Sequence, residues 1–201
     1  MKKKYWSKRF KVNKRRANSL LVVLSLILLI VLVVAFVDRL TDRSDGPAVL
    51  PEAVTQWRPL VLAEMEKQGL SQAWIDVMMA QLMQESGGRH VDIFQCSESK
   101  YGVPGMIESE EESIEQAVYY WLKLIDRAEE LGIEPSRENI LQSYNMGIGY
   151  LDHLKEHRSD TTPELAALFS ETVHQGGGDP NYVDNVLRYL EMAINSREES
   201  Y

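Results

Sequence analysis

The hydrophobic and polar positions divide the chain into one unbroken apolar run and a longer region of helical periodicity. Residues 20–37 carry no charge and are nearly all Leu, Val and Ile. A helix of about 20 apolar residues crosses the hydrocarbon core of a bilayer. The apolar part of a signal peptide is usually shorter, about 7–15 residues, and ends at a small-residue cleavage site, whereas the run here is followed by Asp38 and Arg39. The pattern therefore predicts an uncleaved transmembrane helix over residues 19–37.

The rest of the chain carries the turn and capping residues of an α-helical domain. Residues 38–52 include two prolines and indicate a linker. After residue 52, no stretch alternates between apolar and polar residues for long enough to predict a β-strand. Residues 53–201 are therefore expected to form one mainly α domain. Capping residues, glycines and prolines predict the bounds of its helices. The first helix ends at Gly69, the second runs from Ser71 to Glu85, and the third runs from a capping box at Ser113 to Gly132. A fourth begins at Ser136, a fifth runs from Thr162 to the glycines at 176–178, and the last begins at Asp179. Residues 89–112 are expected to be irregular, with a short hairpin between 90 and 108 as an alternative.

The charges are distributed unevenly along the chain. Residues 1–18 contain nine basic side chains and no acidic one, which leaves thirteen basic against thirty acidic residues in 38–201, a net charge of −17. Because the cytoplasmic flanks of membrane helices are rich in Lys and Arg, residues 1–18 are expected to form a cytoplasmic tail, with the acidic domain outside the cell membrane. Nucleic-acid binding depends on neutralising phosphates, so this domain is not expected to have a nucleic-acid partner.

Other residue patterns favour neither a cofactor nor a metal. Cys96 is the single cysteine, so no intramolecular disulfide can form, and without the flanking signature of a cysteine peptidase it is expected to be a buried small side chain. His153 and His157 are four residues apart, but the sequence between them does not form the His-Glu-x-x-His zinc pattern. We therefore expect no metal site and no cofactor.

One acidic residue falls on the apolar side of its predicted helix. At 100° per residue, with Trp74 at 0°, Met78 and Leu82 lie at about 40° and 80°, and Glu85 lies between them at about 20°. Burial and the negative end of the helix dipole both favour the neutral form of a carboxyl group, which is the form that a general acid requires. The alternative is that the helix ends there and Glu85 turns into water or pairs with Arg89.

Four short motifs resemble those of the goose-type lysozyme and lytic transglycosylase superfamily, and they occur in the family's order. The Glu-Ser motif is matched by residues 84–88, the glutamine motif by residues 92–99, the Ala-Tyr-Asn motif by residues 143–147, and the late tyrosine motif by residues 180–183. The match is incomplete, because Phe-Gln-Cys stands where Leu-Met-Gln is more usual and Ser143 stands in place of Ala. The resemblance extends to the lysozyme-like domains of conjugative-element cell-wall hydrolases and to small membrane-anchored streptococcal proteins.

This resemblance implies a fold, a substrate and roles for particular residues. It implies a lysozyme-like helical domain with a substrate cleft, acting on the MurNAc–GlcNAc bond of peptidoglycan. Glu85 would protonate the glycosidic oxygen as the catalytic acid. Gln95, Tyr144 and Asn145 would hold the sugar and its N-acetyl group, and Tyr182 would line the cleft and help to orient Glu85.

The type of reaction stays open at the level of sequence. Glycosidases usually employ two carboxylates, and the candidates for the second are Asp92, which directly precedes the glutamine motif, Glu98 and Glu108. Lytic transglycosylases resemble an exception in which one Glu serves first as acid and then as base. The prediction is a muramidase or lytic transglycosylase in the cell membrane, with peptidoglycan strands as substrate and division or cell-wall synthesis proteins as candidate partners. A non-catalytic glycan-binding or division-site scaffolding module is the alternative.

Overall fold

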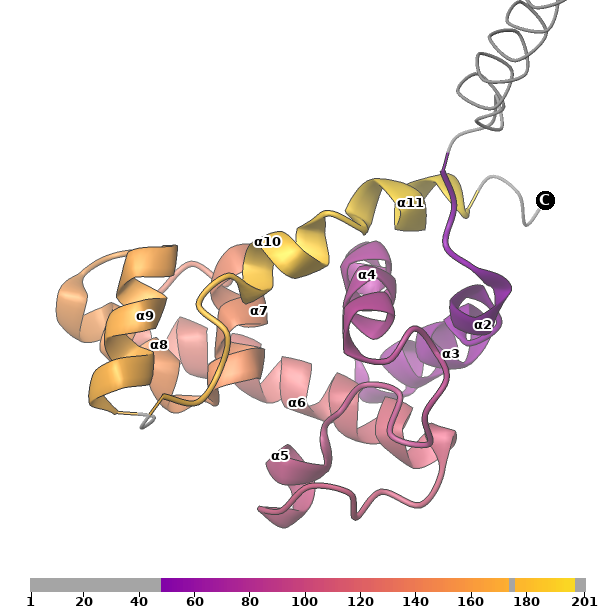
Figure 1. Cartoon of the computed structure of the whole chain (residues 1–201), viewed down its shortest axis with the longest axis horizontal. Helices are drawn as coiled ribbons and strands as arrows, with labels where there is room; N and C mark the ends of the chain where they lie inside the picture. Colours follow the sequence, from indigo (N-terminus) through magenta and orange to yellow (C-terminus); the bar gives the residue numbers. More distant parts are fainter. Residues whose placement is uncertain (1–47, 174–175, 198–201) are drawn as a thin grey trace, which may run out of the picture. The chain divides into compact units, whose positions relative to one another are not determined.

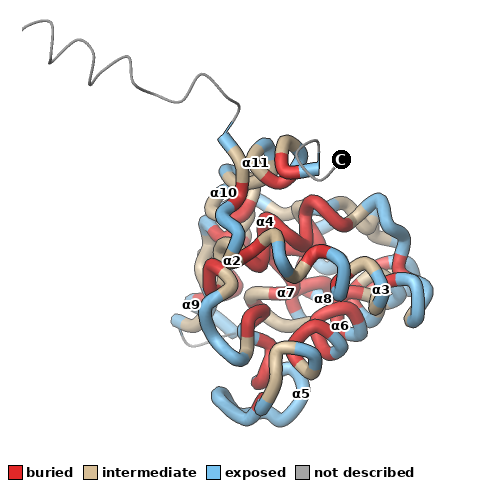
Figure 2. Tube along the Cα trace, turned by 90° about the vertical axis from the view of Figure 1, so that its right-hand side faces the viewer, coloured by how far each residue is buried: buried red, intermediate tan, exposed pale blue. Residues whose placement is uncertain are grey.

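Helix α4 (Ile75–Glu85) lies in the middle of the domain, and other helices pack around it (Figure 1). The computed structural model describes residues 48–173 and 176–197, and within these ranges it contains helices and no β-strand. Eight of the eleven residues of α4 are buried, and its trace is correspondingly red in Figure 2. The prediction of a mainly α-helical domain is confirmed.

The predicted membrane-associated part of the chain lies outside the described residues. Among those that are described, no helix is both long enough and apolar enough to cross a bilayer. The predicted tail (1–18) and transmembrane helix (19–37) fall in the part that is not described, as does most of the predicted linker (38–52). Near the end of that linker, Leu50 is only 3% exposed and its amide donates to Ser196 Oγ at 2.9 Å. Leu50 therefore already belongs to the helical domain.

Two short helices and a 3-10 turn lead into α4. Helix α2 (Glu52–Thr55) is followed by α3 (Arg58–Gln68), which ends as predicted at Gly69, where φ is 86°. Glycine adopts this left-handed conformation without a steric penalty. The side chain of Ser71 then caps the turn η1 (Gln72–Trp74), which runs directly into α4. The second predicted helix is thus confirmed, with a tighter first turn.

The longest helix, α6 (Glu110–Leu131), ends at Gly132 as predicted but begins earlier than its predicted capping box. Its N-cap is Ser109, whose hydroxyl accepts a hydrogen bond from the main chain of the first turn. The prediction that Ser113 caps the helix is wrong. Ser113 is fully buried within α6, and its hydroxyl donates to the Asp92 carboxylate at 2.7 Å. Because Asp92 lies 21 residues away from Ser113, no local sequence pattern indicates that the two side chains are hydrogen-bonded.

Between α4 and α6 the chain is irregular, as predicted, apart from the short helix α5 (Ser97–Tyr101). The alternative of a hairpin in this segment is wrong. The Asp92 carboxylate accepts hydrogen bonds from the amides of Cys96 and Ser97, so these donors are used in a tight turn and cannot take part in a strand ladder.

Helices α7 (Arg137–Met146), α8 (Gly149–His157) and α9 (Pro163–Thr172) form the lobe on the left of Figure 1. Ser136 and Thr162 are the N-caps of α7 and α9, as predicted, and each side chain accepts from an amide three residues later. Helix α8, which follows α7 almost directly, is not among the helices predicted from the sequence. Helix α9 ends before the glycine run that was expected to terminate it.

The C-terminal segment forms two short helices, α10 (Tyr182–Leu187) and α11 (Leu190–Asn195), where the sequence predicts one. Both pack against α4. The guanidinium of Arg58 joins α3, α4 and α11, because it donates to Asp76 at 3.0 Å and to the carbonyl of Ala193 at 2.7 Å. The C-terminal helices therefore close the domain over α4 and bring Tyr182 to its C-terminal end.

After α4 the chain turns at two glycines, Gly87 and Gly88, with φ of 60° and 73°. A Cβ atom placed on Gly88 would lie 1.9 Å from the carbonyl oxygen of Ala53 in α2. The main chain after α4 thus packs directly on the main chain of α2, with no space for a side chain between them.

We expect Gly88→Ala to reduce the free energy of unfolding by about 2–5 kcal/mol, because the left-handed conformation and the clash with Ala53 both oppose it. Gly69→Ala is the matched control: its φ is 86°, but no atom lies within 4 Å of the added Cβ. That change should cost only about 1–2 kcal/mol. Urea unfolding followed by circular dichroism measures both, and equal losses would contradict the close packing described.

Candidate active site

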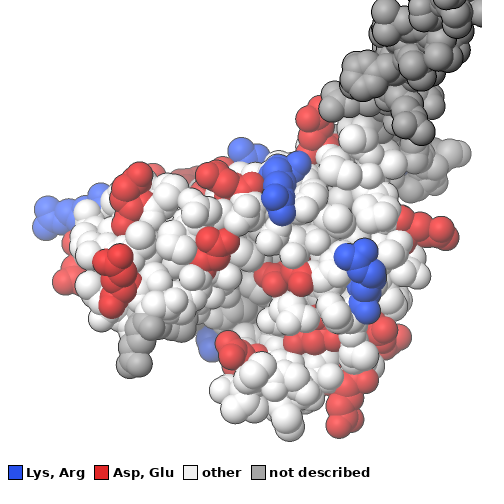
Figure 3. Space-filling model, in the orientation of Figure 1, with Lys and Arg blue, Asp and Glu red and all other residues white. Residues whose placement is uncertain are grey.

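The C-terminal end of α4 opens into a pocket of about 320 Å³. It lies where the last turn of α4, the turn before α5, the middle of α6 and the end of α7 meet, and Figure 3 shows the surface hollowed between the lobe of α8 and α9 and the lobe of α5. The pocket is lined by Glu85, Gln95, Cys96, Glu98, Ser99, Tyr120, Tyr144, Asn145, Met146 and Gly147. The predicted acid and three predicted substrate-binding residues therefore share one pocket.

Glu85 occupies the last turn of α4, partly buried, with one carboxylate oxygen held by a phenol. The hydroxyl of Tyr182 donates to Glu85 Oε1, so this carboxyl group is held by a phenol and not, as in the alternative prediction, by the guanidinium of Arg89. Burial raises the pKa of Glu85 to about 7, against the lowering effect of the Tyr182 hydrogen bond and with a smaller upward contribution from the charge of Asp92. A carboxyl group with this pKa can both give and take a proton near neutral pH.

Tyr182 lies behind Glu85 and is not among the residues that line the pocket. It is 3% exposed, and its pKa lies well above the usual value because the phenol is buried and faces the Glu85 carboxylate. The motif resemblance implies that Tyr182 lines the cleft and helps to orient Glu85. The structure places it in contact with Glu85 but away from the cleft surface.

Both oxygens of Asp92 are occupied by donors from its own turn and from α6. Oδ1 accepts from the Cys96 amide at 3.0 Å and the Ser113 hydroxyl at 2.7 Å, and Oδ2 accepts from the amide and hydroxyl of Ser97 at 2.9 and 2.7 Å. Burial acts to raise the pKa of Asp92, but these hydrogen bonds outweigh it and hold the pKa below its usual value. Asp92 therefore remains ionised and holds the turn that carries Gln95.

The hydrogen bonds around the pocket determine which atoms its polar side chains present. Gln95 is exposed, with φ of 49°, and its Nε2 donates to the Asp92 carbonyl at 2.7 Å, which leaves Oε1 as an acceptor. Asn145 Oδ1 accepts from the Asp179 amide at 2.6 Å, which leaves Nδ2 as a donor. The Tyr144 hydroxyl donates to the Phe94 carbonyl at 3.0 Å, so its oxygen retains acceptor capacity. The pocket therefore presents Glu85 together with amide groups of both polarities.

Comparison with known proteins assigns the domain that carries this pocket to a family. The family model described as Lysozyme-like matches residues 51–201. The chain belongs to the lysozyme-like family. This match covers the whole helical domain, and the lysozyme-like fold predicted from the four motifs is confirmed.

The chain is also similar to proteins of Bacillus subtilis and Streptococcus pyogenes. The bifunctional muramidase/DL-endopeptidase CwlT of Bacillus subtilis is 38% identical over 122 residues, which are 58% of this chain and 36% of that protein. The membrane protein YocA of the same organism is 35% identical over 127 residues, 63% of this chain and 55% of that one. A pneumococcal vaccine antigen A homolog of Streptococcus pyogenes is 32% identical over 125 residues, 61% and 60% of the two chains.

A solved structure is similar to this chain in both fold and sequence. It is the crystal structure of a protein described as similar to lipoprotein, NLP/P60 family, from Staphylococcus aureus, with a TM-score of 0.65 and 31% identity over 71% of this chain and 54% of that one. The chain thus spans less than two thirds of the length of each of these relatives.

Sequence reasoning missed two buried residues of the lysozyme-like domain that lie behind Glu85. Trp121 Nε1 donates to Gln81 Oε1 at 2.8 Å, and Gln81 Nε2 donates to the Tyr182 hydroxyl at 3.1 Å. Gln81 carried a signal that could have found it. At 100° per residue it lies one helical turn before Glu85, about 40° away around the helix axis, and like Glu85 it is a polar residue on the apolar stripe of α4.

Cys96 lines the pocket but its environment does not favour a reactive thiolate. Burial and the neighbouring Asp92 charge raise the pKa of the thiol to about 12. Its sulfur also lies within hydrogen-bonding distance of the Ser113 carbonyl oxygen, at 3.3 Å. Because the thiolate is the nucleophilic form of cysteine, Cys96 acts as a buried side chain of the lysozyme-like domain.

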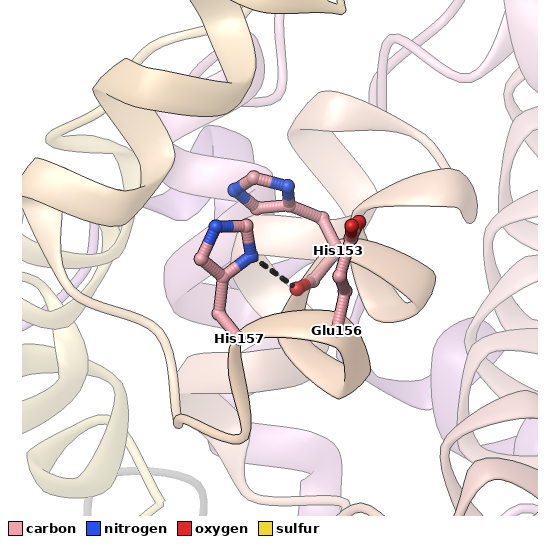
Figure 4. A group of neighbouring side chains, drawn as sticks. All are labelled: His153, Glu156 and His157. Carbon is pink, nitrogen blue, oxygen red and sulfur yellow. Dashed lines mark hydrogen bonds between the residues drawn. The ribbon is translucent and has the colours of Figure 1, made fainter.

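A cluster of metal-ligand types lies on α8, away from the pocket. His153, Glu156 and His157 each place one ligand atom within 4.8 Å of the others. Figure 4 shows the two imidazole rings side by side, with centroids 4.1 Å apart, and Nδ1 of His157 hydrogen-bonded to the carbonyl of His153 at 2.9 Å. His153 also packs against the ring of Phe169 in α9. We interpret the pair as packing between α8 and α9, and the expectation of no metal stays a prediction.

We expect Glu85→Gln to gain stability relative to the unchanged chain as the pH rises. Between pH 4.5 and 7 the folded chain keeps the Glu85 proton that the unfolded chain has lost, so the stability that neutral Glu85 contributes falls over this window. Glu85→Gln has no carboxyl group to titrate at this position. Its free energy of unfolding, relative to that of the unchanged chain, should therefore rise by about 1–3 kcal/mol between pH 4 and 8. Thermal unfolding at several pH values measures it. If the difference in unfolding free energy between the two chains did not change with pH, the pKa of Glu85 would not be raised in the folded state.

Asp92→Asn should destabilise the lysozyme-like domain by about 2–4 kcal/mol, because an amide cannot accept all the hydrogen bonds that the carboxylate accepts. It should also lower the pKa of Glu85, since the charge of Asp92 contributes to raising it. The exposed Asp126 provides the matched control, Asp126→Asn. Chemical denaturation gives the stability and ¹³C NMR of the carboxyl groups gives the pKa. If the pKa of Glu85 were the same in Asp92→Asn, the charge of Asp92 would not contribute to raising it.

Proposed function

We propose that this lysozyme-like protein is a membrane-anchored peptidoglycan glycosidase that cleaves the MurNAc–GlcNAc bond with Glu85 as its acid. The observation that carries the proposal is the partly buried Glu85 carboxyl group, with its pKa raised to about 7, in a pocket lined by Gln95, Tyr144 and Asn145. The name of CwlT as a muramidase supports the same class of substrate.

The acid step needs a proton at the oxygen of Glu85 that faces the substrate. Oε1 is engaged by the Tyr182 hydroxyl, so Oε2 is the oxygen left to carry the proton toward the glycosidic bond. After bond cleavage the carboxylate is the base in the same position. It takes a proton from a water molecule in a muramidase, or from the muramoyl 6-hydroxyl in a lytic transglycosylase, which forms a 1,6-anhydro sugar.

The amide side chains suit an N-acetyl sugar because they offer opposite hydrogen-bonding groups. An acetamido group carries one N–H donor and one carbonyl acceptor. Gln95 Oε1 is free to accept from such a donor, and Asn145 Nδ2 is free to donate to such an acceptor. A neutral pair of this kind holds the sugar without placing a charge beside Glu85, which would change its pKa.

A single-carboxylate mechanism fits the pocket better than a second role for Asp92. Activation of water requires a free lone pair on the base, and four donors from Cys96, Ser97 and Ser113 already occupy the Asp92 oxygens. Glu98 lines the same pocket as Glu85 and is exposed, so Glu98 is the alternative second carboxylate. Glu108 is exposed and is not among the residues that line the pocket.

The proposed setting is the outer face of the cell membrane, with the N-terminus in the cytoplasm. The basic tail and the apolar run over residues 20–37 support it, and so does the name of YocA as a membrane protein. Acidic side chains are spread over the face of the domain shown in Figure 3 and basic ones are fewer there. This charge fits a neutral sugar backbone better than an anionic polymer, and the proposed partners are division or cell-wall synthesis proteins.

The test is digestion of purified peptidoglycan by the full-length chain in mild detergent, with mass spectrometry of the soluble products. We expect muramoyl products, and Glu85→Gln should reduce their rate of formation at least about 100-fold, the usual contribution of a general acid. Glu108→Gln is the matched control, because Glu108 is an exposed glutamate outside the pocket. Glu98→Gln tests the two-carboxylate alternative in the same assay.

The products decide between the reactions. Anhydro-muramoyl ends would identify a lytic transglycosylase, and reducing muramoyl ends would identify a muramidase. Loss of the reducing ends in Glu98→Gln would assign Glu98 as the second carboxylate. If the glycan stayed intact and bound equally well to the unchanged chain and to Glu85→Gln, the enzyme hypothesis would be wrong. The alternative, a glycan-binding or scaffolding module, would take its place.

A further inference from the structure

A buried line of hydrogen bonds runs from α6 through α4 to the carboxyl group of Glu85. Trp121 Nε1 reaches Gln81 Oε1, Gln81 Nε2 reaches the hydroxyl of Tyr182, and that hydroxyl reaches Glu85 Oε1. Trp121 and Gln81 are fully buried and Tyr182 is nearly so. Water therefore does not compete for these groups, and each must be satisfied by its neighbour in the line.

The chemistry of the first group fixes the direction of every bond in the line. An indole nitrogen can only donate, so the Gln81 amide must present its oxygen to Trp121 and its nitrogen to Tyr182. The Tyr182 hydroxyl accepts from that nitrogen and has a single hydrogen, which it donates to Glu85 Oε1. In a neutral carboxyl group the carbonyl oxygen is a stronger acceptor than the hydroxyl oxygen, so the hydrogen bond from Tyr182 favours Oε1 as the carbonyl oxygen. In neutral Glu85 the proton is consequently on Oε2.

We propose that Trp121 and Gln81 are positioning residues that keep the acid proton of Glu85 on the oxygen facing the pocket. They act through Tyr182 and touch no substrate, and their role rests on the proposed function of Glu85 as a general acid. If the Gln81 amide were turned over, its oxygen would accept from Tyr182. Neutral Glu85 could then place its proton on Oε1 and donate it to the Tyr182 oxygen, away from the substrate.

The change Trp121→Phe tests this arrangement, because it removes the indole N–H and keeps an aromatic ring in place. The Gln81 amide is then free to turn and take the Tyr182 hydrogen. Glu85 loses the hydrogen bond that lowers its pKa, so its pKa should rise by about one pH unit. With the proton withdrawn, kcat should fall about 10–100-fold with little change in KM.

The double variant Trp121→Phe with Gln81→Met separates this effect from a packing defect. Methionine has nearly the shape of glutamine but offers no strong acceptor, so Tyr182 has Glu85 as its remaining partner. The double variant should return the pKa of Glu85 to about 7, although both sites are altered. Trp74→Phe is the matched control: its ring packs on Trp121 with centroids 5.4 Å apart, and the pKa should stay at about 7.

The measurement is the ¹³C chemical shift of the Glu85 carboxyl carbon against pH in the full-length chain, assigned with Glu85→Gln, together with the pH dependence of peptidoglycan cleavage. A raised pKa in Trp121→Phe that returns in the double variant supports the proposal. An unchanged pKa in Trp121→Phe, or one that stays raised in the double variant, would overturn it. The NMR titration needs no activity, so a chain that cleaves no peptidoglycan would refute the proposed function and leave this test standing.

Discussion

The site depends on taking one carboxyl group out of water without giving it a cation. Glu85 is partly buried at the end of α4, and its hydrogen-bond partner is the neutral phenol of Tyr182. A guanidinium in that place would favour the ionised form and lower the pKa, as opposite charges do. A wholly apolar neighbour would raise the pKa further and leave the proton fixed. The phenol lies between these limits and leaves the pKa at about 7, where the proton can leave and return.

Asp92 shows the opposite treatment of the same chemical group seven residues further along the chain. Two hydroxyls and two main-chain amides donate to its oxygens, and they keep it ionised although it is partly buried. Its negative charge in turn helps Glu85 to hold a proton. The two environments therefore reinforce each other: the residue that organises the turn stays charged, and the residue in the pocket stays neutral more easily because of it.

The parts of this structure that sequence predicts are those that local chemistry decides. Gly69, Gly132, Ser136 and Thr162 end or begin helices through their own backbone preferences and caps, and Glu85 and the pocket residues could be found from a stripe and four motifs. The errors arise where a partner lies far away in the sequence. Ser113 has the pattern of a cap, but its hydroxyl donates to Asp92, 21 residues away. The orientations of the Asn145 amide and the Tyr144 hydroxyl likewise depend on distant partners, the Asp179 amide and the Phe94 carbonyl.

The C-terminal helices contribute to the site although none of their residues lines the pocket. Tyr182, the first residue of α10, holds Glu85, and the amide of Asp179 just before it fixes the orientation of the Asn145 side chain. Gln142 of α7 donates to the carbonyl of Asp179 at 2.8 Å and ties this turn to the wall of the pocket. Packing of α10 and α11 against α4 therefore helps to position both Glu85 and Asn145, the proposed acid and one of the proposed sugar-binding residues. A displacement of these helices would disturb both groups at once, which makes the closure of the domain over α4 a condition for a working site.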